Sequence, residues 1–313
     1  MTNLSEFTFL SSDGRTQLHG MLWEPQEVPV RAVLQVCHGV AEHIARYDGF
    51  ARALNEQGIV VAGHDHLGHG KSLPEGGTPV YFGQGNTWDT VVDDIYVLHQ
   101  RLKQRYPNVP LCIMGHSMGS FLTRTYLIRY PGTVKAAVIM GTGWQPRAAI
   151  TGGLALANAI AAVSGEQATS DVVTELAFGS YNKLFAPNRT KVDWLSADES
   201  NVDDYLADPM CGADATVGLF RQMLHGLRFN QRMGHLRRMD KDMPVLFVAG
   251  DKDPVGSCGK GVQQSYDAFR AAGMRDCTIK LYPGLRHEIL NEKAYAAAIT
   301  KDIEMWLLSK IER

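Results

Sequence analysis

Short, almost continuous runs of apolar residues alternate along this chain with longer segments whose apolar residues recur at helical spacing. The runs cover residues 32–39, 59–65, 110–115, 134–141, 243–250 and 277–284, and they predict strands. The continuous runs 32–39 and 59–65 predict strands that are buried on both faces. The segments 47–58, 87–107, 118–131, 259–273 and 292–311 predict amphipathic helices. Two earlier runs, 6–10 and 18–25, flank the polar turn SSDGRT and predict a β-hairpin. This alternation predicts an α/β fold, with a mostly parallel central sheet and helices on both faces.

Residues 144–239 interrupt the alternation, because they hold little strand pattern and several helical or irregular segments. We therefore expect a core built from residues 1–143 and 240–313, with a helical cap inserted at 144–239 above the sheet. The most apolar part of this insertion, 148–165, is shorter than the roughly 20 apolar residues that a bilayer span needs. The sequence therefore predicts no transmembrane segment.

Composition and charge narrow the class of partner. Of the 313 residues, 45% are hydrophobic and 20% are charged, as in ordinary globular proteins, and the formal net charge is −2. A protein that binds nucleic acid is expected to carry a basic face, so this charge argues against a nucleic-acid partner. Five cysteines without a CxxC pair and an N-terminus without a secretory signal favour free thiols and a cytoplasmic location.

The stretch GHSMGS places Ser117 between Gly115 and Gly119, after a predicted strand and before a predicted helix. This is the setting of a nucleophile elbow, a strained turn that lifts the serine oxygen out of the sheet. Side chains at either glycine would collide with the neighbouring strand or helix. The start of the following helix also supplies free N–H groups that favour a developing oxyanion. The alternative is an ordinary serine in a glycine-rich turn.

A nucleophilic serine needs a base and an orienting carboxylate, which follow it along the chain in the order acid, then base. His287 comes after the last predicted strand, and Asp251 and Asp253 come after the strand before it. Ligand sites of open α/β sheets gather at these strand ends. We favour Asp253 because Pro254 helps to fix its loop, whereas Asp251 can bond its own turn. For His287 the alternative is a loop histidine that caps or packs.

A second oxyanion donor is expected from the loop after the strand at 32–39. The sequence there is CHGVAEH, so the backbone N–H of Val40 is the candidate, paired with the N–H of Met118. His38 and Gly39 would shape this loop and take no part in the chemistry. Such a mechanism needs neither a metal nor a cofactor.

The stretch HGVAEHIARYDGFARALNEQGIVVAGHDHLGHGKS (38–72) resembles the HG-x-x-EH…RY…D-x-x-GHG-x-S pattern of monoacylglycerol lipases and bacterial lysophospholipase-like α/β-hydrolases of the serine aminopeptidase S33 type. GHSMGS, GDKDPVG and YPGLRHEILNE match the same family, and DWLSADESNVDDYLADPMCG (193–212) resembles its cap. The resemblance implies an α/β-hydrolase fold, and it implies a set of catalytic positions: Ser117 as nucleophile, Asp253 as acid, His287 as base, and Val40 with Met118 as oxyanion donors.

Ala41 departs from this pattern, since the HG-x-G-EH form has glycine at that position. The extra methyl is expected to alter the loop or to narrow the acyl entrance. This departure is expected to affect which substrates are accepted, and to leave the reaction of the serine unchanged.

The glycine-rich stretch GHDHLGHGKS (63–72) suggests two other classes of site. It ends like a phosphate-binding P-loop, but Asp65 stands where the first glycine is required. His64, His66 and His69 approach the zinc pattern of metallo-β-lactamase-like hydrolases, but Gly68 stands at the aspartate position. We therefore interpret this stretch as a turn held by the hydrogen bonds of Asp65 and the histidines.

The cap is expected to decide which acyl groups enter. Our hypothesis is that the apolar segment 148–165 lines an acyl channel and makes transient contact with lipid surfaces; the alternative is a buried cap helix. A further set of aromatic residues would line the pocket or form the core of the cap itself, namely Phe178, Tyr181, Phe185 and Trp194.

These observations lead to one functional interpretation. We expect a serine carboxylic-ester hydrolase that works through an acyl-enzyme, on monoacylglycerols, lysophospholipids or related single-chain esters. The alternatives are a carboxylesterase for short or aromatic esters and a proline-iminopeptidase-type peptidase. An acyltransferase or a haloperoxidase would use the same serine. A non-catalytic hydrolase-fold binding protein belongs to a different class, and the presence of all three candidate catalytic residues argues against it.

Overall fold

The structure is a computed structural model that describes residues 1–311. Its strands are β1 (Thr2–Leu10), β2 (Gln17–Pro25), β3 (Ala32–Cys37), β4 (Ile59–His64), β5 (Leu111–His116), β6 (Ala137–Met140), β7 (Val245–Gly250) and β8 (Cys277–Tyr282). Its α-helices are α1 (Asp48–Asn55), α2 (Thr87–Arg105), α3 (Met118–Arg129), α4 (Arg147–Ser164), α5 (Asp171–Thr174), α6 (Ser180–Lys183), α7 (Glu199–Ala207), α8 (Val217–Asn230), α9 (Met233–Leu236), α10 (Lys260–Ala271) and α11 (Ala296–Ile311). Short 3₁₀ turns η1 (Ile44–Tyr47), η2 (Gly70–Ser72) and η4 (Asp193–Leu195) and the π-helical turn η3 (Glu175–Gly179) complete the set.

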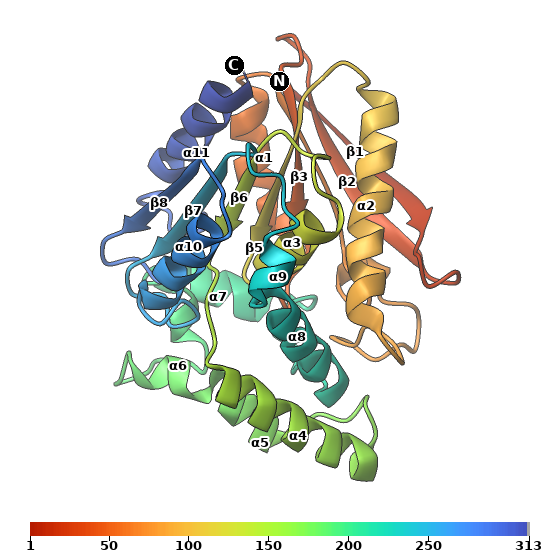
Figure 1. Ribbon diagram of the computed structural model, residues 1–313, viewed down its shortest axis with the longest axis vertical. Coiled ribbons are helices and arrows are strands. Elements are labelled where there is room, and N and C mark those ends of the chain that lie inside the picture. Colours follow the sequence, from red (N-terminus) through yellow and green to blue (C-terminus); the bar gives the residue numbers. More distant parts are fainter. Residues whose placement is uncertain (312–313) are drawn as a thin grey trace.

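The strands form one sheet in the order β1-β2-β4-β3-β5-β6-β7-β8 (Figure 1). β1 and β2 form the predicted hairpin, and β2 pairs antiparallel with β4. From β4 to β8 every neighbouring pair is parallel. The predicted mostly parallel sheet with helices on both faces is therefore confirmed.

Two hydrophobic layers cover the sheet because successive side chains of a strand point to opposite faces. Val33 packs in the layer that contains α2, α3 and α10, whereas its neighbour Leu34 packs in the layer that contains α1 and α11. Figure 1 shows these two groups of helices on opposite sides of the sheet. Since both faces are covered, the central strands are apolar at almost every position, which is the pattern that the sequence displays.

The chain between β6 and β7 forms α4 to α9, and α4 to α7 lie at one end of the sheet (Figure 1). α8 connects this layer to the core, because it contacts both α4 and α3. These helices stand next to the loops that follow the parallel strands. The division into a core and a cap with boundaries at 144 and 239 stays a prediction.

Helix α4 is the apolar segment of this layer, and it buries only Ile150, Leu154 and Ala157. The alternative of a buried cap helix is therefore wrong. Among residues 1–311, α4 alone is long and apolar enough to pass as a membrane span by length and composition, with 17% of its 18-residue window buried. Its packing against α8 shows that its buried side serves the fold of the protein.

The last helix begins four residues later than its sequence pattern indicates, at Ala296 instead of Glu292. The side chain of Glu292 accepts a hydrogen bond from the N–H of Ala197 at 2.8 Å. Its carbonyl oxygen accepts hydrogen bonds from Tyr295 and Ala296, at 2.8 Å each. Glu292 thus closes the turn before the helix and ties it to the helical layer.

Candidate active site

Ser117 lies in the turn between β5 and α3 with φ of 54° and ψ of −123°, a conformation that L-residues rarely adopt. Flanking glycines allow the turn. A Cβ on Gly115 would lie 2.2 Å from the carbonyl oxygen of Gly119, and a Cβ on Gly119 would lie 2.1 Å from the carbonyl oxygen of Cys37. Both distances are far below van der Waals contact. The local sequence therefore forces the elbow, and only 8% of Ser117 remains exposed.

His287 and Asp253 meet beside this turn, from the loops after β8 and β7. His287 Nδ1 lies 2.9 Å from Asp253 Oδ2, and both residues are buried. The other oxygen of Asp253 accepts the N–H of Val255 at 2.9 Å, which fixes the carboxylate. Asp251 points elsewhere, because its Oδ1 accepts the N–H of Gly284 at 2.8 Å.

Ser117 and His287 line one cavity of about 350 Å³ together with the loop that holds Gly39 and Val40. A Cβ built on Gly39 would lie 3.0 Å from the Cβ of Ser117, so this loop passes directly over the serine. Met118 is the first residue of α3, and its N–H has no partner within the helix. The structure thus brings all five residues singled out from the sequence to one place.

A second cavity, of about 650 Å³, shares Val40, Ser117 and Trp194 with the first. Its remaining wall is largely apolar and is supplied by α3, α4 and α8; it includes Met118, Phe121, Ile150, Leu156, Phe220 and Leu224. The first cavity has a mixed wall that includes Glu175, Asn182 and Lys191, so a space with charged and polar side chains and a more uniformly apolar space meet at the serine.

Aromatic residues of the helical layer close the site on the histidine side. The ring of Trp194 lies 5.1 Å from the ring of His287, and Phe178 and Tyr181 contact Trp194 in turn. These three residues line the cavities. Phe185 instead packs against the guanidinium of Arg286, 4.0 Å from the ring centre. The aromatic set thus divides between the pocket wall and the packing of the layer.

Sequence reasoning missed a buried charge network in and beside the loop that passes over the serine. Glu42 accepts the N–H of Gly39 at 2.5 Å and lies 3.2 Å from His116 Nδ1, while Arg46 bridges Glu42 and Glu288. Glu288, which follows His287, is buried and pairs with Arg46, so it locks the loop that carries the histidine. These charges hold the loop over the serine.

The electrostatics of this network follow from the pairing. Burial acts to raise the pKa of Glu42, but the hydrogen bond with His116 and the charge of Arg46 hold that pKa well below its usual value. Burial acts to lower the pKa of His116, yet its hydrogen bond and ion pair with Glu42 raise that pKa. Each buried charge is therefore stabilised by an opposite one.

The stretch 63–72 has a structural role. The carboxylate of Asp65 accepts the N–H groups of Ile44 at 2.8 Å and Lys71 at 2.9 Å, so the Lys71 N–H that a phosphate would use is occupied. Among residues 1–311, the imidazoles of 64, 66 and 69 do not form a group of three with metal-ligand spacing. The interpretation as a hydrogen-bonded turn holds for Asp65, while both ring nitrogens of His64 and of His66 lack a partner.

Comparison with known proteins identifies the family of the chain. The family model described as "Serine aminopeptidase, S33" matches residues 28–294. The chain is 30% identical to a monoacylglycerol lipase of Mycolicibacterium smegmatis over 312 residues, covering 98% of both chains. It is 27% identical to human monoglyceride lipase over 300 residues, covering 95% of this chain and 88% of the human one.

Solved structures show that related proteins have the same fold. A thermostable carboxyl esterase from Bacillus coagulans, crystallised with glycerol, superposes with a TM-score of 0.91 at 26% identity, covering 99% of this chain and all of the other. A lipase in an open form gives a TM-score of 0.90 at 25% identity, with the same coverage. The chain therefore belongs to the serine aminopeptidase S33 family of α/β-hydrolases and is a hydrolase.

Proposed function

We propose that the protein is a serine carboxylic-ester hydrolase that forms an acyl-enzyme and acts on monoacylglycerols, lysophospholipids or related single-chain esters. The observation that carries this proposal is the position of Ser117. It stands in a strained elbow where a cavity of mixed lining, which contains His287 and charged side chains such as Lys191, meets an apolar cavity of about 650 Å³. An amphiphilic ester placed across the serine has a head group and a chain that match the two spaces.

In the proposed reaction, Ser117 Oγ attacks the ester carbonyl while His287 accepts its proton. Asp253 accepts the hydrogen bond from Nδ1–H of His287, which keeps the imidazole in the tautomer that can take a proton at Nε2. The N–H groups of Val40 and Met118 donate to the carbonyl oxygen as it becomes negative. Losing one such donor costs other enzymes roughly 10²–10³ in rate.

The tetrahedral intermediate then collapses. His287 gives its proton to the departing alcohol, and the acyl group remains on Ser117. Water enters, His287 removes one of its protons, and the resulting attack on the acyl carbonyl releases the carboxylic acid and restores the serine hydroxyl. Every step uses groups of this chain.

Two alternatives differ in the substrate. A peptidase that removes an N-terminal residue needs an anion for the substrate ammonium. Glu42 and Glu288 are paired with Arg46 and Glu175 is paired with Lys183, so the exposed and solvent-screened Asp214 is the remaining carboxylate of the cavity wall. An esterase for short or aromatic esters would leave most of the apolar cavity empty. A lipid ester needs no anion for an ammonium group, and its chain would occupy the apolar cavity. The relatives named as lipases agree with this choice.

Substrate access is proposed to involve α4. Its outer side is exposed, and Val163 stands with 89% of its surface in solvent. Val172 and Leu184, on the following segments, are also exposed. We propose that this apolar surface makes transient contact with lipid aggregates, from which a single-chain ester passes along α4 to the serine.

The compartment is proposed to be the cytoplasm. All five cysteines are free thiols in the structure, and Cys37 and Cys112 are fully buried within the sheet. Burial raises the pKa of both thiols to about 12, so they stay protonated and unreactive at neutral pH. Free thiols suit a reducing environment.

The experiment that tests the proposal combines active-site labelling with an ester panel. A fluorophosphonate probe is expected to label the wild type and Ser257→Ala, whose serine also lines the apolar cavity, but not Ser117→Ala. Monodecanoyl glycerol is expected to give a higher kcat/KM than acetyl esters, aryl acetates or prolyl amides. Labelling that persists in Ser117→Ala refutes the nucleophile, and a preference for acetyl esters refutes the lipid substrate.

A further inference from the structure

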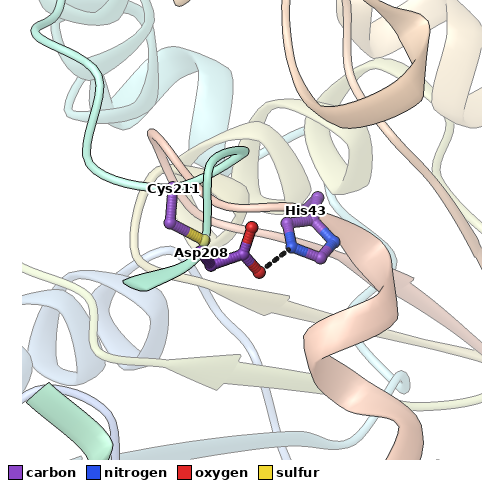
Figure 2. A group of neighbouring side chains, drawn as sticks. All are labelled: His43, Asp208 and Cys211. Atoms are coloured by element: carbon purple, nitrogen blue, oxygen red, sulfur yellow. Dashed lines mark hydrogen bonds and ion pairs between the residues drawn. The ribbon is translucent and has the colours of Figure 1, made fainter. Parts of the chain in front are cut away.

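A histidine, an aspartate and a cysteine lie close together, as Figure 2 shows. Their chain neighbours Glu42 and Gly212 line the cavity of Ser117. His43 Nε2 lies 2.8 Å from Asp208 Oδ2, and one ligand atom from each of His43, Asp208 and Cys211 lies within 4.8 Å of the other two. In the described part of the chain, this is the only group of three such side chains with that spacing. His43 is buried, while Asp208 and Cys211 are half-buried and reachable from solvent.

The local sequence explains why the aspartate and the cysteine lie together. The N–H of Cys211 donates to the carbonyl oxygen of Asp208 at 3.0 Å, and the N–H of Met210 donates to Asp208 Oδ1 at 2.8 Å. Aspartate in the first position and proline in the second, here Pro209, favour such a turn. The turn leaves Asp208 Oδ2, which contacts His43, and the Cys211 thiol on the same side as the histidine.

The histidine comes from the loop that passes over Ser117. The carbonyl oxygen of Ala41 accepts hydrogen bonds from the N–H of Gly212 and the hydroxyl of Tyr205, both at 3.0 Å. These two bonds hold the loop against the segment 205–212, and they bring His43 opposite the turn. The site therefore joins two segments that are more than 160 residues apart in the sequence.

We propose that His43, Asp208 and Cys211 form a binding site for Zn²⁺ that ties the loop over Ser117 to the helical layer. Thiolate, imidazole and carboxylate are the ligands that zinc prefers, at about 2.3 Å for sulfur and about 2.0 Å for nitrogen and oxygen. Water takes the fourth position. On binding, Cys211 releases its thiol proton to solvent, and His43 coordinates through Nε2 as the neutral imidazole with its proton on Nδ1.

The geometry needs a small adjustment. Ligand atoms around a tetrahedral zinc ion lie roughly 3.3–3.7 Å apart, as the bond lengths require. A contraction from at most 4.8 Å is within reach of side-chain rotations at Asp208 and Cys211, since both are half-buried on a turn. The short contact between His43 and Asp208 opens to admit the ion.

The charges around the site favour a divalent cation. Glu42 and Glu288 lie behind it with Arg46 between them, and Arg46 donates two hydrogen bonds of 2.7 Å to Glu288. Together with Asp208, Glu42 and Glu288 make three carboxylates around the single guanidinium of Arg46. Even when His116 is protonated against Glu42, the surroundings keep a net negative charge. The guanidinium itself is held over the ring of Tyr205, 5.0 Å from its centre.

The position of the site assigns it a regulatory role, a consequence that rests on the proposed function. Ala41, Glu42 and Gly212 line the cavity of Ser117, so an ion between His43 and Cys211 fixes two walls of that cavity to each other. Substrate entry and product release require such walls to move. Zinc is therefore expected to slow ester hydrolysis reversibly, and the enzyme stripped of metal by EDTA is expected to remain active.

Metal binding is tested without any substrate. The EDTA-treated protein is titrated with Zn²⁺ and with Co²⁺, whose thiolate complex absorbs in the near ultraviolet. We expect one ion per chain, a thiolate band and a rise in melting temperature. Cys211→Ser is expected to remove the band and to weaken zinc binding by more than the roughly 10–100-fold that losing a partner behind a ligand costs. Cys277→Ser, which also changes a half-buried free thiol, is the matched control and is expected to bind as the wild type does.

Two results overturn the site. If Cys211→Ser binds zinc as tightly as the wild type, the ion sits elsewhere, for example on a surface histidine. If Cys277→Ser abolishes the thiolate band, a different cysteine is the ligand. Asp208→Asn gives an independent check, because the amide is a weak zinc ligand but can still accept the N–H of Met210. It is expected to weaken binding without loss of folding.

The regulatory part is tested by kinetics. Zinc is expected to lower the kcat of the wild type and of Cys277→Ser, with recovery on EDTA, and to leave Cys211→Ser unaffected. Inhibition that is equal in Cys211→Ser refutes the link between this site and turnover. Failure of the protein to hydrolyse any ester would refute the proposed function, and the binding experiment would still decide the zinc site.

Discussion

Nδ1 of His287 lies 2.9 Å from Oδ2 of Asp253, and both side chains are buried. The same region holds Asp251, whose carboxylate bonds Gly284 instead. Two aspartates two positions apart thus have separate tasks, and this difference makes the catalytic assignment testable by a matched pair of variants.

Asp253→Asn is expected to lower kcat for ester hydrolysis by about 10⁴. The new amide can keep the N–H of Val255 through its oxygen and then presents NH₂ to His287, which forces Nδ1 to accept and puts the proton on Nε2, the wrong nitrogen. Asp251→Asn keeps an oxygen acceptor for Gly284, so its kcat is expected to stay near the wild-type value. The measurement is the steady-state kcat of each variant, compared at equal fractions of folded protein. A large loss in Asp251→Asn with little change in Asp253→Asn would make Asp251 the acid.

Leu156→Trp is expected to shorten the apolar cavity, because Leu156 is half-buried on the side of α4 that lines it. The kcat/KM for decanoyl esters is expected to fall about tenfold or more, while that for acetyl esters stays nearly constant. Val163→Trp, on the exposed side of the same helix, serves as the control. An equal loss for both chain lengths in Leu156→Trp would place the acyl chain elsewhere.

The stability of the protein is expected to fall between pH 6.5 and about pH 4 through the histidines of the stretch 63–72. Burial lowers the pKa of His64 from 6.5 to about 3 and that of His69 to about 4. The unfolded chain therefore binds more protons than the folded one in this interval, so the free energy of unfolding decreases as the pH decreases. Above pH 6.5 these residues contribute no pH dependence.

His64→Leu is expected to reduce this decline, because one buried imidazole accounts for about 2 kcal/mol between pH 7 and pH 5 by linkage. The measurement is urea unfolding at both pH values. Phe9→Leu, which alters a ring packed on His64 at 5.2 Å, is the control: it is expected to lower stability equally at both. If His64→Leu loses as much stability between pH 7 and pH 5 as the wild type does, the fold does not keep this imidazole neutral.

Ala41→Gly is expected to raise the free energy of unfolding by about 1 kcal/mol. Ala41 has φ of 52°, a left-handed conformation that strains any residue with a Cβ. Ala45→Gly, in the right-handed turn η1, is the matched control and is expected to destabilise by roughly 0.5–1 kcal/mol. A loss of stability in Ala41→Gly would show that the methyl contributes packing that outweighs the strain.

The sequence pattern predicted those features that local chemistry dictates. The strands and the helices of the core followed from apolar periodicity, and the turn at Ser117 followed from its glycines, whose hydrogens are the only atoms that fit. The helical start at Ala296 was missed, because it depends on the bond between Glu292 and Ala197, a residue nearly one hundred positions away. The exposure of α4 was also left open, since an apolar helix has the same sequence in a core and on a surface.

The sequence by itself determined the fold class, the family and the residues brought to the candidate site, because each is encoded in periodicity or in a short motif. Only the tertiary structure decided how Arg46 neutralises Glu288, 242 positions away, and how His43 meets Asp208 and Cys211. Such contacts depend on how the sheet and the helical layer come together. Buried charges are stable only when opposite charges reach them, and that pairing is a property of the folded chain.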